Sequence, residues 1–175
     1  MRPQRRRGAE NFYLKEIVAA KQPWCLAVLS LCLCVSVAAF QHPNFSGDFL
    51  LNLRASKLSP SVAAAAQGGM LHIDHSEPNF RQQMTIIFSG KPIETKYQLT
   101  TDGREVVSEA GGRKSASSIH WDGDALVNVT RIEMPNGGMT ITFRFQLENN
   151  GRRVRASEQV RGGGRDQDNV WVFDR

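Results

Sequence analysis

The segment at residues 72–77 holds the densest group of potential metal ligands, because it reads His-Ile-Asp-His-Ser-Glu. On a β-strand His72 and Asp74 lie on one face, whereas His75 points to the other. A zinc site needs three or four ligands that converge on one point, and only His120, on another predicted strand, could join this pair. We therefore interpret the segment as a solvated strand end, and we predict neither a metal site nor a cofactor.

The sequence lacks the usual signatures of covalent or metal-dependent catalysis, since it has no Gly-x-Ser-x-Gly elbow and no zinc-protease helix motif. Residues 161–165, Arg-Gly-Gly-Gly-Arg, would cradle a phosphate only in front of a helix N-terminus. Residues 170–173, Val-Trp-Val-Phe, are instead typical of a strand, so we interpret the glycines as a hairpin loop. We expect no enzymatic activity and predict no catalytic residue.

The net charge is concentrated at the N-terminus. The chain of 175 residues carries 22 Lys and Arg against 17 Asp and Glu, which gives a formal charge of +5 at pH 7. Residues 1–39 alone hold six basic and two acidic side chains, so the rest of the chain is almost neutral. A nearly neutral domain is a poor partner for a phosphate backbone, and we expect no nucleic-acid binding.

Residues 24–40 contain no charged side chain and follow a basic stretch, which is typical of a secretory signal peptide. The small residues at 37–39 predict cleavage between Ala39 and Phe40. The alternative is an uncleaved anchor in the inner membrane, because residues 24–40 are just long enough to span a bilayer. Membrane contact is expected only through this segment.

The leader also contains every cysteine of the chain, namely Cys25, Cys32 and Cys34. We therefore expect residues 1–39 to be a signal peptide and residues 40–175 to form one domain without disulfides. We expect the mature protein to be periplasmic or extracellular.

The remainder of the chain alternates between apolar and polar residues, the pattern of a strand with one buried face. The clearest run is residues 139–147, Met-Thr-Ile-Thr-Phe-Arg-Phe-Gln-Leu. Similar runs are Phe49–Leu53, Met70–His75, Met84–Phe88, Ile93–Thr101, Ser117–Trp121, Leu126–Met134, Arg152–Arg161 and Val170–Phe173. About eight to ten strands with turns such as Asp102-Gly103 predict an antiparallel meander in which each strand folds back onto the last. Such a meander covers its edges best by closing into a barrel.

One segment interrupts this alternation. Residues 56–69 include Ala63–Ala66, a run with high helix propensity. We predict a long loop with one helical turn between the first and second strands. This loop either folds over one mouth of the barrel or forms a flexible surface excursion.

Residues 45–58 read Phe-Ser-Gly-Asp-Phe-Leu-Leu-Asn-Leu-Arg-Ala-Ser-Lys-Leu. This segment resembles the opening pattern, Phe-Ser-Gly-x-Trp-x-Leu-Asn-x-x-x-Ser-Lys, of a largely uncharacterised bacterial family of exported, lipocalin-like proteins. Residues 97–103, 119–126 and 170–175 are similar to later parts of that pattern. The resemblance implies a closed antiparallel barrel of the calycin type that binds small apolar molecules, and it carries over no catalytic residue.

More distantly, Gly47-Asp48-Phe49 resembles the Gly-x-Trp signature that opens lipocalin and related calycin barrels. In those barrels the aromatic residue plugs the closed end, and an Arg of the last strand packs over it. The resemblance assigns these two roles to Phe49 and Arg175. The change from Trp to Phe removes the indole N–H donor.

The apolar face of the strands would line the barrel interior, and its larger aromatic residues are our candidates for ligand contact: Phe49, Tyr97, Trp121, Phe143 and Phe145. A barrel of this size is either packed with side chains or hollow. We predict an all-β, lipocalin-like, up-and-down barrel that binds a small hydrophobic ligand non-covalently. The alternative is a packed barrel without a cavity that acts as a protein–protein interaction module of the envelope, with no protein partner identified.

Overall fold

The computed structural model describes residues 42–135 and 137–175. The predicted signal peptide and its cleavage site between Ala39 and Phe40 lie outside the described residues. Within the described part, the structure contains no helix with the length and apolar character needed to cross a membrane.

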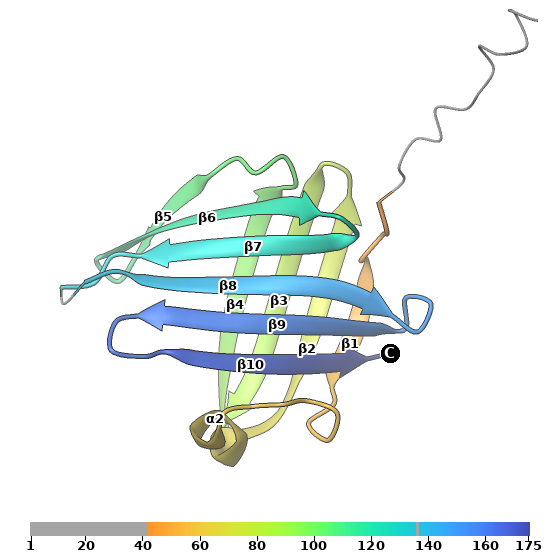
Figure 1. The fold of residues 1–175 in the computed structure, drawn as a ribbon, viewed down its shortest axis with the longest axis horizontal. Coiled ribbons are helices and arrows are strands. Elements are labelled where there is room, and N and C mark those ends of the chain that lie inside the picture. Colours follow the sequence, from red (N-terminus) through yellow and green to blue (C-terminus); the bar gives the residue numbers. More distant parts are fainter. Residues whose placement is uncertain (1–41, 136) are drawn as a thin grey trace, which may run out of the picture. The chain divides into compact units, whose positions relative to one another are not determined.

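Ten strands and one short helix make up the described chain (Figure 1). In chain order they are β1 (Gly47–Leu51), α2 (Pro60–Ala65), β2 (Ala66–Ser76), β3 (Asn79–Phe88), β4 (Lys91–Thr100), β5 (Val106–Ala110), β6 (Arg113–Asp122), β7 (Ala125–Ile132), β8 (Met139–Glu148), β9 (Arg153–Gly162) and β10 (Gln167–Asp174). The strand order in the sheet is β4-β3-β2-β1-β10-β9-β8-β7-β6-β5, and every pair is antiparallel. This is an all-β, up-and-down, nearly closed barrel, as the alternation predicts.

The barrel remains open at one seam, because β4 and β5 form the two edges of the sheet. The prediction that the Asp102-Gly103 turn folds one strand onto its predecessor is therefore wrong. The Asp102 carboxylate accepts hydrogen bonds from the Thr100 hydroxyl (2.6 Å) and the Arg104 N–H (3.0 Å). The Gly103 N–H donates to the Ile119 carbonyl of β6 (2.9 Å). These bonds direct the chain toward β6, so β5 pairs with β6 rather than with β4.

The other differences from the predicted elements are small. β5 was not among the predicted runs, because its exposed Val106 and Val107 are adjacent and do not alternate. The helix spans Pro60–Ala65 instead of Ala63–Ala66, because Pro60 begins it at a position where no N–H is needed. Ala66 already has the extended conformation of β2 (φ −74°, ψ 126°).

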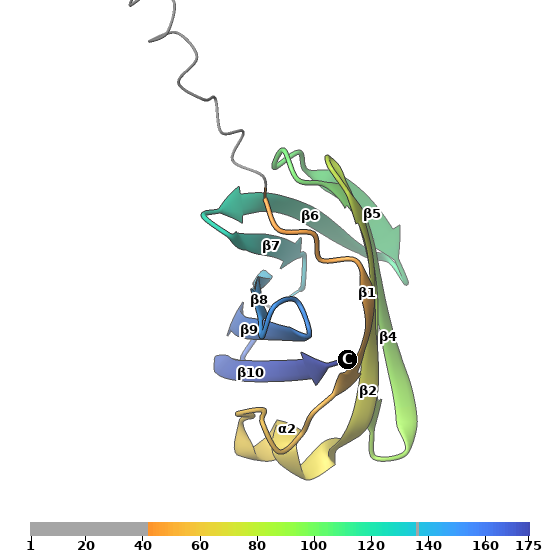
Figure 2. The ribbon, with the colours of Figure 1, turned by 90° about the vertical axis from the view of Figure 1, so that its right-hand side faces the viewer.

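The strands form two groups that cross one another. Figure 1 shows β1–β4 running across the direction of β6–β10. Figure 2 shows these groups facing each other, with α2 at one end. Side chains that point inward from both groups form one hydrophobic core, which includes Phe45, Phe49, Leu71, Ile73, Phe80, Met84, Leu99, Ile119, Leu126, Phe143, Phe145, Val154, Trp171 and Phe173.

Candidate functional site

One end of the barrel is filled by aromatic side chains. Phe45, Phe49, Phe80 and Phe145 are at most 1% exposed. The rings of Phe80 and Phe145 lie 6.4 Å apart, and those of Phe45 and Trp121 lie 6.0 Å apart. We call this the closed end; it contains the start of β1 and the turns that follow β2, β6 and β8.

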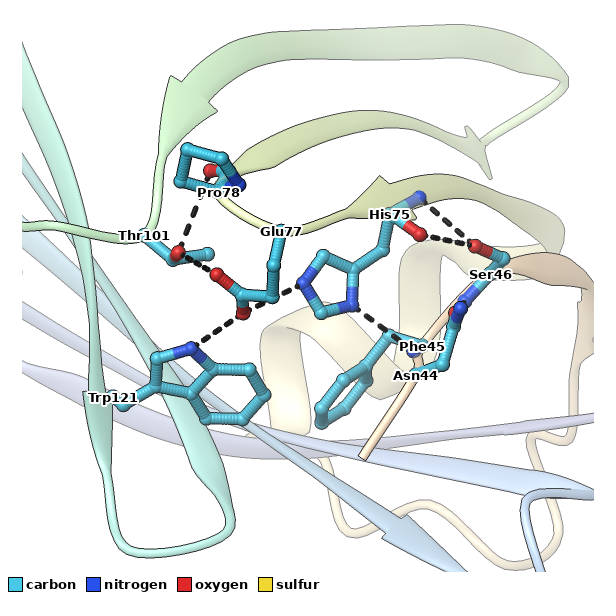
Figure 3. Close-up of polar contacts among 8 residues, drawn as sticks. All are labelled: Asn44, Phe45, Ser46, His75, Glu77, Pro78, Thr101 and Trp121. Carbon is cyan, nitrogen blue, oxygen red and sulfur yellow. Dashed lines mark hydrogen bonds and ion pairs between the residues drawn. The ribbon is translucent and has the colours of Figure 1, made fainter. Parts of the chain in front are cut away.

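A polar cluster adjoins these aromatic rings (Figure 3). Oε1 of Glu77 accepts hydrogen bonds from the Trp121 indole N–H (2.7 Å) and from Nε2 of His75 (3.1 Å). Oε2 of Glu77 accepts a hydrogen bond from the Thr101 hydroxyl (2.5 Å). Because Trp121 belongs to β6 and Glu77 to the β2–β3 turn, this cluster joins the two sides of the open seam. We call it the Glu77 clasp.

The clasp also holds the segment that leads into β1. The Phe45 N–H donates to Nδ1 of His75 (3.3 Å), and the Ser46 hydroxyl bonds to the backbone N–H and C=O of His75 (2.9 Å each). Since Nδ1 accepts, the proton of the neutral ring lies on Nε2, facing Glu77. His42 stacks on Trp121, with ring centres 4.1 Å apart.

The chemistry of the clasp is structural. Burial raises the pKa of Glu77, but hydrogen bonds from Thr101, Trp121 and His75 outweigh this effect and hold the pKa below its usual range. The carboxylate is therefore ionised at neutral pH. The His75 ring bonds to a backbone N–H on one side and to Glu77 on the other, so neither ring nitrogen activates a nucleophile.

Arg175 covers the closed end. Its guanidinium carbon lies 4.6 Å from the centre of the Phe49 ring, within cation–π range. It also donates a hydrogen bond to the Ser46 carbonyl. A Cβ at Gly47 would collide with the guanidinium, and the φ of Gly47 is +147°. Glycine at this position therefore makes room for the packing of Arg175 on Phe49.

The opposite end, which we call the open end, contains α2 and the turns that follow β3, β5, β7 and β9. Some inward-facing side chains are only partly buried here, including those of Ile132 and Ile141, whereas Ile86 and Val160 are buried. Ile93, which the alternation of β4 also directs inward, is 54% exposed. The interior is therefore more accessible from this end than from the closed end.

A network around Glu158 fixes α2 at the open end. Oε2 of Glu158 accepts hydrogen bonds from the side-chain N–H groups of Asn169 (2.7 Å) and Trp171 (2.9 Å). Oδ1 of Asn169 accepts a hydrogen bond from the Ser59 N–H at the start of α2 (2.7 Å). Phe88 packs edge-on against Trp171, with ring centres 6.3 Å apart. The helix is thus attached to β9 and β10.

Several polar side chains project into the interior between the two ends. The hydroxyls of Ser117 and Thr130 share a hydrogen bond (3.0 Å), and Thr130 donates to the Tyr97 hydroxyl (3.3 Å). Tyr97 belongs to β4 and Thr130 to β7, so these hydroxyls link strands on either side of the open seam. Asn128 is 2% exposed and donates to the Ser118 carbonyl (3.2 Å).

Two interior groups have no hydrogen-bond partner among the described residues. Gln82 is 3% exposed, and neither its Oε1 nor its Nε2 is bonded. The Thr95 hydroxyl is also buried without a partner. In the register of the sheet Gln82 lies opposite Ile73 and Tyr97, and Thr95 lies opposite Met84, so Gln82 and Thr95 are diagonal neighbours on the inner face. Unpaired polar groups in apolar surroundings are unusual in folded proteins and require an explanation.

Two shallow hollows lie beside β1 and the C-terminal residues. One is lined by residues 46–50 and the other by residues 50–54 with Gln67 and Gly68, and both include Asp174 and Arg175. The outward-facing Leu50 is 67% exposed and lies opposite Met70, which is 46% exposed. Leu50 and Met70 thus form an exposed apolar patch beside these hollows.

The five predicted ligand-contact residues all face inward, but the structure does not bring them to one place. Phe49, Trp121 and Phe145 lie at the closed end, where Trp121 belongs to the Glu77 clasp. Phe143 stacks on Phe145 with ring centres 5.7 Å apart and is 5% exposed. Tyr97, which lies opposite Gln82, is the member of the set that reaches the polar interior.

The histidines considered as metal ligands lie in different surroundings. His72 faces outward and bonds to Asp48 (2.6 Å), His75 is buried in the clasp, and His120 is exposed. Across residues 42–135 and 137–175 the structure shows no group of three or more metal-ligating side chains.

Gln82 and Thr95 were not found by sequence reasoning, although a signal for Gln82 exists. Phe80, Met84, Ile86 and Phe88 recur at every second position apart from the place that Gln82 occupies. Gln82 is therefore the polar member of an apolar row. The alternation predicts a strand over Met84–Phe88, whereas β3 begins at Asn79 and includes Gln82.

No protein-family model and no curated protein matches the chain. Solved structures do resemble it. A secretory abundant heat soluble (SAHS) protein from Ramazzottius varieornatus matches with a TM-score of 0.56 and 9% identity over 78% of this chain and 98% of that one. Secretory abundant heat soluble protein 4 from the same organism matches with a TM-score of 0.50 and 12% identity over 75% and 94% of the two chains.

Human cRBP IV matches with a TM-score of 0.49 and 19% identity, over 76% of this chain and 98% of that chain. At such identities a likeness reflects the fold alone. The two SAHS proteins therefore support the barrel architecture described above, and the function has to be argued from the side chains of this chain.

Proposed function

We propose that the protein is a carrier that binds a small apolar molecule non-covalently inside the barrel, reached from the open end. The observation that carries this proposal is the unpaired amide of Gln82. A folded barrel that only had to be stable would place an apolar side chain at this position, because an amide buried without a partner costs about 1–3 kcal/mol. A buried polar residue without a partner, in an interior that is mostly apolar, is typical of a site that orients a ligand.

The distribution of buried side chains also supports entry of the ligand from the open end. The closed end is filled by rings, by the Glu77 clasp and by Arg175, whereas some inward side chains of the open end, such as those of Ile132 and Ile141, are half-buried. A ligand that covers the exposed apolar surface at this end is stabilised by about 25 cal/mol for each Å² removed from water.

Native mass spectrometry of protein purified without detergent tests this proposal. We expect an excess mass over the bare chain that disappears on denaturation, or an adduct after addition of a neutral amphiphile. Repeated gentle preparations that show only the bare chain and take up no amphiphile would favour the packed interaction module, with Leu50 and Met70 as its contact surface.

We also propose that residues 1–39 direct export and that the protein belongs to the bacterial family of exported lipocalin-like proteins that residues 45–175 resemble. The apolar segment at residues 24–40 and the small residues before Phe40 support export. Export is tested by the mass of the denatured protein recovered from its host. A mass that corresponds to a chain beginning at Phe40 would support cleavage of the signal peptide. A chain that retains residues 24–40 and sediments with membranes would support the anchor instead.

A further inference from the structure

We infer that the ligand is uncharged and carries one group that both donates and accepts hydrogen bonds, such as a long-chain amide or alcohol, which Gln82 and Thr95 bind. This inference rests on the proposed function and adds the chemical class of the ligand. It follows from the atoms that lack partners and from the charges that surround them.

The unpaired atoms of Gln82 define what the ligand must offer. Nε2 has hydrogens to donate and Oε1 has lone pairs to accept, and both are free among the described residues. A group that only accepts would satisfy Nε2 and leave Oε1 buried and unpaired. The Thr95 hydroxyl, a diagonal neighbour on the inner face, can donate or accept and adds a third point of contact.

The charges of the interior exclude an ionised head group at this place. The buried polar residues of the described chain are His75, Gln82, Thr101, Ser117, Asn128, Thr130 and Asn169, without a Lys or Arg among them. The Glu158 carboxylate, which faces the interior from β9, would repel an anion. A carboxylate ligand would therefore be buried without a cation to balance it, at a high cost in free energy.

The apolar surroundings define the rest of the molecule. Gln82 is flanked in its own strand by Phe80 and Met84 and lies between Ile73 and Tyr97 of the neighbouring strands. A hydrocarbon chain or ring system can cover these side chains and extend toward the half-buried Ile141 at the open end. The polar group of the ligand would then lie deeper in the barrel than its apolar part.

The test compares four ligands of equal chain length: decanamide, decan-1-ol, methyl decanoate and sodium decanoate. Their affinities are measured by isothermal titration calorimetry below the concentrations at which they aggregate, with the wild-type protein and two variants. Gln82→Leu removes the amide. Gln98→Leu is the matched control, because Gln98 is exposed on the outward face of β4, next to Tyr97.

We expect the amide and the alcohol to bind about tenfold more tightly than the ester, which lacks the donor, and more tightly than the anion. Gln82→Leu should weaken the amide and the alcohol more than the ester, which loses only its hydrogen bond from Nε2, and should therefore reduce this preference to less than about threefold. Gln98→Leu should leave the preference unchanged. Equal binding of all four ligands, or tightest binding of decanoate, would overturn the inference while the proposed function stands. If no ligand of the series binds, both fail.

Discussion

The Gln82→Leu substitution should make the ligand-free protein more stable, against the usual outcome for a buried position. Most substitutions of residues that are 3% exposed destabilise, because they remove packing or hydrogen bonds. Here the amide has no hydrogen bond to lose. Leu has a similar volume, although it branches one carbon earlier, and it places only apolar methyl groups at this position.

The expected gain can be estimated from the cost of the unpaired amide. Removing it should recover about 1–3 kcal/mol, from which small misfits in a packed interior take away up to about 1 kcal/mol. The result lies between about 0 and 3 kcal/mol, and we take the middle of this range, a rise of about 1–2 kcal/mol in the free energy of unfolding, as the expected value. For a domain of this size each kcal/mol shifts Tm by about 4 °C, so Tm should rise by about 4–8 °C.

Equilibrium unfolding in urea measures this change, on protein that has been unfolded and refolded to remove bound molecules. Thr95→Val and Thr130→Val form a matched control pair. Both remove an interior hydroxyl, but the Thr95 hydroxyl has no partner and the Thr130 hydroxyl bonds to Ser117 and Tyr97. Thr95→Val should be neutral or stabilising, and Thr130→Val should cost about 1 kcal/mol. A Gln82→Leu protein less stable than wild type by about 1 kcal/mol or more would refute the reasoning.

Three further predictions concern the closed end. The hydrogen-bonded Glu77 has a pKa below its ordinary value of 4.5, so its stabilising effect is full above that pH and is lost as the pH falls through the lowered pKa. In urea titrations Glu77→Gln should therefore be less stable than wild type at pH 7, and the difference in the free energy of unfolding should narrow toward pH 3. Gly47→Ala should destabilise the protein because the new Cβ collides with Arg175. In a double-mutant cycle with Arg175→Ala, the coupling free energy should be about 0.5 kcal/mol or more in favour of the double variant. Strictly additive effects of the two substitutions would contradict this contact. Phe145→Ala, at a side chain that is 0% exposed, should cost about 3–5 kcal/mol in the same titration, and a loss below about 1 kcal/mol would mean that the closed end is not tightly packed.

Much of the fold could be predicted from the alternation of residue types. Residues 139–147 form β8 almost as predicted, because a half-buried strand needs an apolar residue at every second position. The inward direction of Phe143 and Phe145 follows from the same pattern. The seam between β4 and β5 could not be predicted, because it depends on the bond from Gly103 to Ile119, and the sequence does not encode that contact locally.

The candidate site was less accessible to sequence reasoning. Aromatic residues are typical of barrel interiors, yet Phe49 and Trp121 close the barrel instead of lining its open part. The informative residue is a polar one, Gln82, whose meaning depends on the absence of partners. Such an absence is a property of the three-dimensional structure, so no pattern of residue types reveals it.

The most direct test of the central claim is to map the binding site of decanamide by NMR, using backbone amide shifts and side-chain methyl signals. We predict that the largest changes lie on inward-facing residues between the clasp and the open end, including Gln82, Thr95 and Ile141. The outward-facing Leu50 and Met70 should be unaffected. Changes confined to Leu50, Met70 and Asp174 would place the ligand in the outer hollows and contradict binding inside the barrel.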